Sequence, residues 1–136
     1  MTNTTDSLLD RARSFFKGIE TSSNLSGHLR RIDEIIQFVP ADGPAFHVRI
    51  GGGKVNFGAG SEYNEHDTRA LYITGNEQAL GGLLKGDETF AEAIYHCRIQ
   101  VADYRNKEPR MAAFSRLLRL GVWDQVRGAR IFKPEK

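Results

Sequence analysis

The chain has 136 residues, of which 40% are hydrophobic and 26% charged, with one cysteine and a formal net charge of +2. This length fits one domain whose core needs no metal, and a single cysteine excludes an intrachain disulfide. The small net charge gives no nucleic-acid signal, and no apolar run reaches the roughly 20 residues of a membrane-spanning helix. The N-terminus lacks the basic start and apolar stretch of a signal peptide, so we expect a cytoplasmic protein.

We expect a single domain over residues 1–136, with flexible ends at residues 1–6 and 133–136. The first predicted element is an amphipathic helix that Ser7 and Asp10 begin as a potential capping box. Gly18 and the run Thr21–Asn24 are expected to end it. Its apolar residues recur at helical spacing, namely Leu8, Leu9, Ala12, Phe15, Phe16 and Ile19.

The segment from Ser26 to Gln37 fits a helix or a strand, and the β-branched run before Pro40 favours a strand in its second half. A β-hairpin follows, because apolar residues alternate with polar ones on both sides of Gly51-Gly52-Gly53. A polar loop then leads to a strand over Thr68–Thr74.

The second half of the chain alternates between helical and strand patterns. Asn76 and Gly86 are expected to begin and end a Leu-rich helix, and Asp87 to begin a second short helix. A strand over Arg98–Asp103 and a final helix from Pro109 to Gly121 complete the order. This order predicts an α+β fold, with about five mostly antiparallel strands covered on one face by helices.

Catalytic and metal-binding motifs find little support. Lys54 follows three glycines, but its neighbour is Val55 and both flanks are strands, so a hairpin turn explains the motif better than a phosphate loop. The four histidines lack metal-ligand spacing, and Cys97 next to His96 is expected to be a small buried residue. The acidic loop around Glu65 is expected to be solvated. We therefore expect no catalytic residue, metal or cofactor.

From Ile35 to Gly121 the chain resembles the sterol carrier protein 2 (SCP2) family. The resemblance rests on Leu80-Gly81-Gly82-Leu83-Leu84-Lys85-Gly86, then Ala93-Ile94-Tyr95-His96, then Arg98-Ile99-Gln100-Val101. Ile94 and Tyr95 stand where that family places paired aromatic residues, His96 where it has Gln, and Cys97 where it has Gly. The resemblance implies a sheet under several helices and a tunnel between them that binds fatty acids, acyl-CoA esters, sterols or similar lipids, without catalysis.

The residues that we expect to contact such a ligand are large and lie on the late helices. They are Phe90, Ile94, Tyr95, His96, Phe114, Leu117, Leu118 and Trp123. Plain core packing is the alternative for each of them. For His96, the alternatives are a contact with the ligand's head group and a satisfied histidine at a helix end.

Two other functions fit the composition. A cone-shaped NTF2-like enzyme could use Tyr95, His96 and Asp103, although that fold places its long helices first. An interaction module could dock on a lipid-metabolising enzyme through the C-terminal part. From Arg110 onward that part carries seven basic and two acidic residues, a net charge of +5, which also suits a peripheral membrane contact or a solvated helix face. The apolar residues after Gly121 suggest a cap over the pocket or a homodimer interface.

Overall fold

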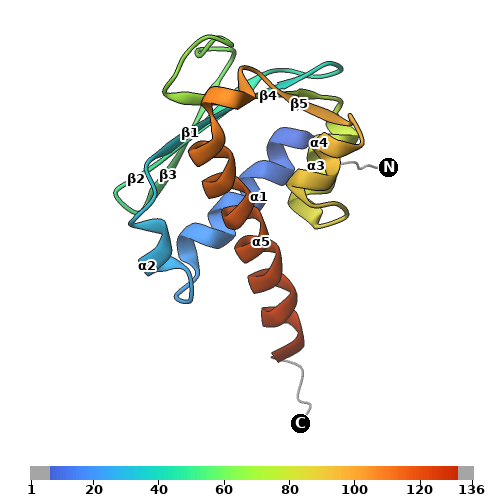
Figure 1. Cartoon of the computed structure of the whole chain (residues 1–136). Coiled ribbons are helices and arrows are strands. Elements are labelled where there is room, and N and C mark those ends of the chain that lie inside the picture. Colours follow the sequence, from blue (N-terminus) through green and yellow to red (C-terminus); the bar gives the residue numbers. More distant parts are fainter. Residues whose placement is uncertain (1–6, 132–136) are drawn as a thin grey trace.

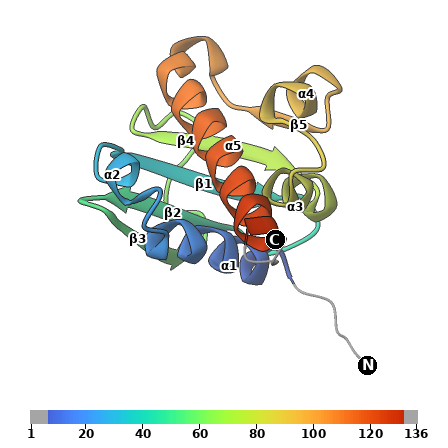
Figure 2. The same cartoon turned by 90° about the horizontal axis from the view of Figure 1, so that it is seen from below.

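The computed structural model describes residues 7–131, and side chains up to residue 125, as a sheet with a layer of helices against it (Figure 1). All the helices lie on one face of the sheet, as the view from below shows (Figure 2). The ends that were expected to be flexible, residues 1–6 and 133–136, lie outside the described residues. No helix in the described part is long and apolar enough to cross a bilayer.

The sheet has five strands in the order β3-β2-β1-β4-β5. Its neighbours pair antiparallel except β1 and β4, which run parallel with Ile35 opposite Ala70. The mostly antiparallel sheet predicted from the sequence is therefore confirmed. The strands are β1 (Glu34–Pro40), β2 (Phe46–Gly51), β3 (Lys54–Ala59), β4 (Ala70–Gly75) and β5 (Ile99–Val101).

The β2–β3 hairpin and β1 form where the alternating pattern predicts them. Gly52 and Gly53 have φ angles of 60° and 79°, the left-handed values that a two-residue hairpin turn requires. The ambiguous segment divides into the short helix α2 (Ser26–Leu29) and strand β1, as favoured.

One face of the sheet contributes to the core. Residues with a period of two along β1, β2 and β4 point towards the helices, because successive side chains of a strand alternate between faces. The rings of Phe38 and Phe46 stack with centroids 4.9 Å apart, and Phe114 from the last helix packs edge-on against Phe38 at 6.2 Å. The core-facing residues of these three strands are Ile36, Phe38, Phe46, Val48, Ile50, Leu71 and Ile73.

The larger helices are α1 (Leu8–Thr21), α3 (Glu77–Lys85), α4 (Phe90–Tyr95) and α5 (Glu108–Ile131), with a 3-10 turn η1 (Tyr104–Asn106) before α5. Several caps are confirmed. The Ser7 hydroxyl accepts from the Asp10 N–H at 3.1 Å, and the Asn76 side chain accepts from the Ala79 N–H at 2.7 Å. Gly86 ends α3 in a left-handed conformation.

The prediction that Asp87 begins α4 is wrong. The Asp87 N–H bonds to the Gly82 carbonyl at 2.9 Å and so belongs to the end of α3. Thr89 begins α4, and it exchanges hydrogen bonds with Glu92 in a capping box.

Gly121 does not end the last helix, which continues to Ile131. A Cβ atom at Gly121 would lie 2.5 Å from Cζ of Phe15 and 2.9 Å from Cδ1 of Ile19. The glycine therefore lets α5 cross closely over α1 instead of stopping the helix.

The start of α5 is fixed to the sheet by a buried lysine. Lys107 is 1% exposed, and its ammonium group donates to the Ala70 carbonyl at 2.6 Å. Burial lowers the pKa of this ammonium group. Strand β4 thereby positions the first turn of α5.

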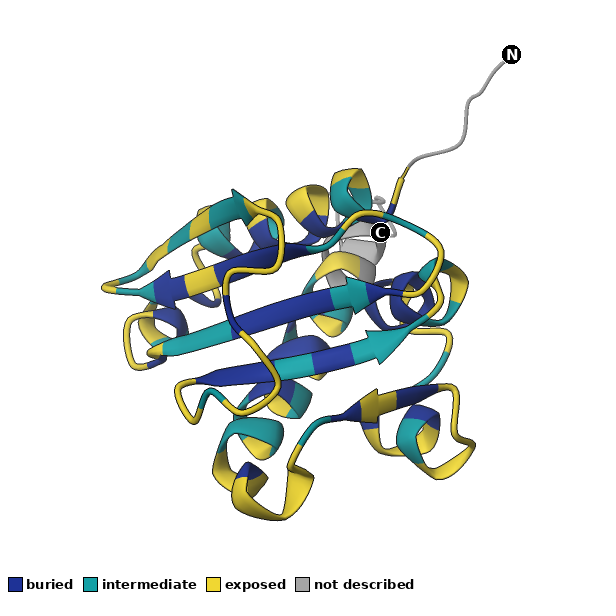
Figure 3. Cartoon of the chain, turned by 90° about the horizontal axis from the view of Figure 1, so that it is seen from above, coloured by how far each residue is buried: buried dark blue, intermediate teal, exposed yellow. Residues whose placement is uncertain are grey.

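The outer face of the sheet is crossed by the loop of residues 60–69 (Figure 3). The buried Gln37 side chain donates to the Phe46 and Gly60 carbonyls at 3.0 and 3.1 Å and accepts from the Tyr63 N–H at 3.1 Å. Tyr63 is buried edge-on against His47. The acidic side chains of Glu62 and Glu65 are exposed, so the loop is solvated on one side only.

Candidate functional site

An apolar groove of about 280 Å³ opens between α3, the start of α4 and α5. Its wall is apolar at five positions, and its edge is polar. The lining residues are Leu83, Gly86, Glu88, Thr89, Phe90, Leu118, Arg119, Val122 and Trp123.

Two local backbone features, the left-handed Gly86 and the capping box at Thr89, shape this groove. The left-handed Gly86 turns the chain away from α3, and a Cβ atom there would lie 2.6 Å from Cγ1 of Val122, so α5 approaches closely only because the residue is glycine. The Thr89 capping box then begins α4 with Phe90 inside, where its ring packs edge-on against Phe114 at 5.2 Å.

The groove has a buried floor and an open rim. Phe90 and Leu118 are buried and form part of the floor. The Trp123 side chain stands at the rim and is 54% exposed. An apolar molecule that entered would therefore cover surface that now faces water.

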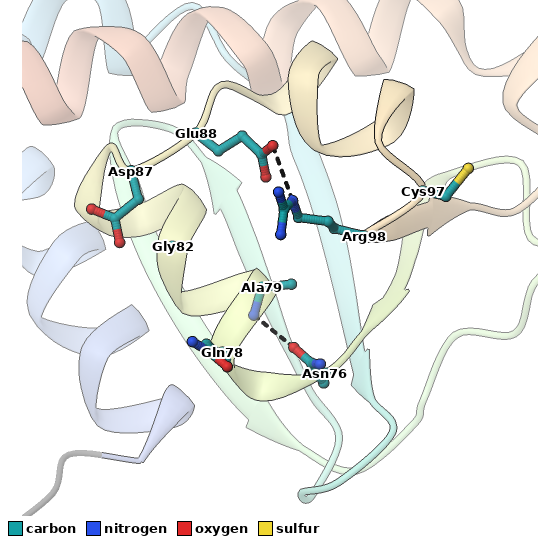
Figure 4. A pocket seen from close by; sticks show the side chains of 8 residues that line it. All are labelled: Asn76, Gln78, Ala79, Gly82, Asp87, Glu88, Cys97 and Arg98. Carbon is teal, nitrogen blue, oxygen red and sulfur yellow. Dashed lines mark hydrogen bonds and ion pairs between the residues drawn. The ribbon is translucent and has the colours of Figure 1, made fainter.

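A polar pocket of about 510 Å³ lies next to the groove, between α3, the α3–α4 turn and the start of β5 (Figure 4). Glu88 lines both cavities. The pocket is lined by Asn76, Gln78, Ala79, Gly82, Asp87, Glu88, Cys97 and Arg98.

Glu88 holds two cationic or polar groups at the boundary between the cavities. One of its carboxylate oxygens lies 2.8 Å from Nδ1 of His96 and accepts from Nε of Arg98 at 3.2 Å (Figure 4 shows the Arg98 contact). The Glu88 side chain is largely buried, whereas those of His96 and Arg98 are about half exposed. An incoming anion could reach Arg98 from the pocket side.

Cys97 is exposed, so the expectation of a small buried residue is wrong. Its φ angle is +59°, and it ends α4 in a Schellman motif. The Cys97 N–H bonds to the Ile94 carbonyl and the Arg98 N–H to the Ala93 carbonyl, at 3.0 and 2.9 Å. Glycine suits this left-handed position best, because it has no Cβ atom.

The structure divides the eight expected ligand-binding residues into three groups. Phe90, Leu118 and Trp123 line the groove. Phe114 and Leu117 are buried in the main core behind it. Ile94 is partly buried against that core, while Tyr95 is 83% exposed and its ring contacts His96 at the end of α4.

Sequence reasoning did not assign Leu83 or Gly86 to the wall, and it gave Val122 only as part of a cap over the pocket or of a dimer interface. A signal was present: Val122 follows Leu118 by four residues and so shares its side of α5, provided that the helix continues past Gly121. Within the described residues, no group of three His, Cys, Asp or Glu side chains could hold a metal ion.

Solved structures with the same fold include sterol carrier proteins. A ubiquinone synthesis protein described as UbiJ-SCP2 superposes with a TM-score of 0.58 at 13% identity, over 83% of this chain and 96% of that chain. The crystal structure of a sterol carrier protein 2 gives 0.57 at 10% identity, over 82% and 93%. The solution structure of sterol carrier protein domain 2 of Helicoverpa armigera gives 0.57 at 16% identity, over 89% and 93%.

The fold is therefore SCP2-like, as the sequence resemblance implied, and not the NTF2-like cone. At these identities the likeness concerns the fold alone. No protein-family model matches the chain, and the curated proteins contain no significant match to it.

Proposed function

We propose that the chain binds an apolar ligand of the fatty acid, acyl ester or sterol class and carries it without altering it chemically. The groove between α3, α4 and α5 carries this proposal, because it combines a buried apolar floor with an accessible rim. The SCP2-like fold supports it, since solved structures of that fold include sterol carrier proteins.

The energetics favour ligands with long hydrocarbon chains. Each methylene group moved from water into an apolar wall contributes about 0.8 kcal/mol, so affinity should rise with chain length until the groove is full. Association and side-chain ordering subtract several kcal/mol, so we expect measurable affinity only for the longer chains.

The ligand's polar end belongs at the polar pocket in this proposal. Glu88 lines both cavities, so a tail in the groove leaves a head group near Arg98. A carboxylate there would compete with Glu88 for the Arg98 guanidinium, which lies 3.2 Å from the Glu88 carboxylate.

A titration with a fluorescent fatty acid, followed by displacement with unlabelled acids of increasing length, tests the proposal. We expect saturable binding, and we expect Val122→Asp to weaken it at least about tenfold by placing a charge in the groove. Ala112→Asp adds the same charge on an exposed part of α5 and should leave binding unchanged. Absence of saturable binding to the unsubstituted protein, or equal loss in both variants, would refute the proposed site.

A further inference from the structure

One side of α5 faces solvent along a regular stripe. Ala112, Arg116, Arg119 and Trp123 are all exposed, and they follow one another at spacings of four, three and four residues. Such spacings place side chains on one side of an α-helix. The sequence repeats the spacing with Arg127 and Arg130.

The stripe is basic over the residues whose side chains the structure describes. Among the residues that the structure describes, Arg116 and Arg119 form no ion pair. The nearest acidic residue of α5, Asp124, instead accepts a hydrogen bond from the Asn24 side chain at 3.1 Å.

A second arginine, Arg31, lies near Arg116 in the segment that follows α2. Arg31 and His28 line a pocket of about 260 Å³ together with Arg116. Burial, followed by the charges of Arg116 and Arg31, lowers the pKa of His28. Asp33 and Glu34 line the same pocket, but Glu34 is bonded to Arg110 at 2.9 Å.

The stripe also holds an aromatic residue at the rim of the groove. Arg119 and Trp123 belong both to the stripe and to the lining of the groove, so the groove opens beside the exposed arginines. The end of α5 extends beyond the other helices, away from the sheet (Figure 1). A flat surface can therefore approach this end of the helix without meeting the rest of the domain.

We propose that this stripe, defined by Arg116, Arg119 and Trp123, docks on an anionic lipid bilayer, with the mouth of the groove at the membrane surface. The inference rests on the proposed function, because a carrier of an apolar ligand must collect it from a lipid phase. Arginines complement anionic head groups, and tryptophan favours the boundary between head groups and hydrocarbon.

A bilayer fits these observations better than a nucleic acid does. The chain's net charge is only +2, and the part before Arg110 is acidic by three charges. The apolar groove next to the arginines would contribute nothing on a phosphate backbone, whereas it would face acyl chains at a bilayer.

Flotation of the full chain with vesicles tests the inference. Vesicles of phosphatidylcholine with phosphatidylglycerol should carry the protein, vesicles of phosphatidylcholine alone should not, and high salt should release it. Trp123 is the single tryptophan of the chain, so its emission reports directly on the stripe. We expect a blue shift and protection from acrylamide quenching on the anionic vesicles.

The double variant Arg116→Gln/Arg119→Gln should lower the vesicle affinity about 30-fold, since each basic residue at a membrane surface contributes roughly a factor of five. The matched control is Arg49→Gln/Lys54→Gln, which removes the same charge from exposed positions on the outer face of the sheet. The control should bind as the unsubstituted chain does.

No binding to anionic vesicles, equal loss in both double variants, or unchanged Trp123 emission on bound vesicles would each overturn the inference. Self-association in the absence of lipid, or preference for a nucleic acid at equal salt, would identify a different occupant and also overturn it. Fatty-acid binding by the unsubstituted chain, measured without vesicles, separates this failure from that of the proposed function, because that assay contains no bilayer for the stripe to contact.

Discussion

The left-handed backbone of Cys97 destabilises the fold, because an L-residue with a Cβ atom is strained at a φ angle of +59°. We predict that Cys97→Gly raises the free energy of unfolding by about 1 kcal/mol. Urea denaturation followed by circular dichroism measures the change.

Cys97→Ala is the matched control, since it removes the thiol but keeps the strained Cβ atom. Its stability should stay close to that of the unsubstituted chain. Equal stabilisation by both substitutions would show that the thiol, and not the backbone, is responsible.

Arg98 should distinguish ligands by their head groups. It is half exposed towards the polar pocket, and its guanidinium is held only by Glu88 among the described residues. We predict that Arg98→Gln weakens the binding of a fatty acid about tenfold and leaves the alcohol of the same chain length unaffected.

Displacement titrations with the acid and the alcohol check this prediction. Because Arg98→Gln leaves the groove intact, the alcohol serves as the internal control. Similar losses for both ligands would mean that Arg98 supports the structure of the pocket and does not contact the head group.

At the level of elements, the crossing of α1 and α5 depends on Gly121. Alanine has the higher helix propensity, yet a methyl group at this position would collide with the ring of Phe15. We therefore predict that Gly121→Ala lowers the free energy of unfolding by about 1–3 kcal/mol.

Gly27→Ala in α2 is the comparison, because a Cβ atom there meets nothing within 4 Å. It should be neutral or slightly stabilising. Urea denaturation of the two variants in parallel measures their free energies of unfolding. A Gly121→Ala protein as stable as the unsubstituted chain would show that α1 and α5 can move apart without loss of stability.

Helix ends were predictable where their cause is local. Asn76 begins α3 through a hydrogen bond that spans three residues, and Gly86 ends it through its own φ angle. Gly121 could not be interpreted this way, because the reason for the glycine is a ring more than a hundred positions earlier. The start of α4 was predictable, since Thr89 and Glu92 have capping-box spacing, but Asp87 is an equally good cap by residue type.

At the scale of the whole molecule, stability should respond to pH through His28. Its pKa is lowered by burial and by Arg116 and Arg31, and its Nε2 atom is buried without a hydrogen-bond partner in the described part of the chain. The unfolded chain therefore takes up the proton first as the pH falls. The contribution of His28 to stability is complete above the unfolded pKa of about 6.5 and declines below it.

We predict that the free energy of unfolding of the unsubstituted chain decreases as the pH is lowered from 7.5 to 5.5. The free energy of unfolding of the His28→Asn variant should decrease less over the same interval. Urea denaturation at the two pH values measures both slopes. His66→Asn, at an exposed histidine of the outer loop, is the control and should keep the slope of the unsubstituted chain. Identical slopes for all three proteins would rule out His28 as the group responsible.

The fold followed from the sequence more completely than the site did. Alternation and caps indicate which residues face inward. Phe90, Leu118 and Trp123, which line the groove, were expected at the ligand as large residues of the late part of the chain, together with what the family resemblance implies. Alternation and caps do not indicate whether three elements meet tightly or leave a gap between them. That gap depends on the approach of Val122 to Gly86, which is a contact between distant parts of the chain.

The single parallel pair of strands bears on how quickly the chain reaches its native state. Strands β1, β2 and β3 follow one another in sequence and pair antiparallel across short connections. Strand β4 pairs with β1 only after the chain has passed through residues 41–69, and β5 pairs with β4. Bringing the ends of this long connection together costs conformational entropy, so we expect the pairing of β4 with β1 to be among the slow steps of sheet assembly.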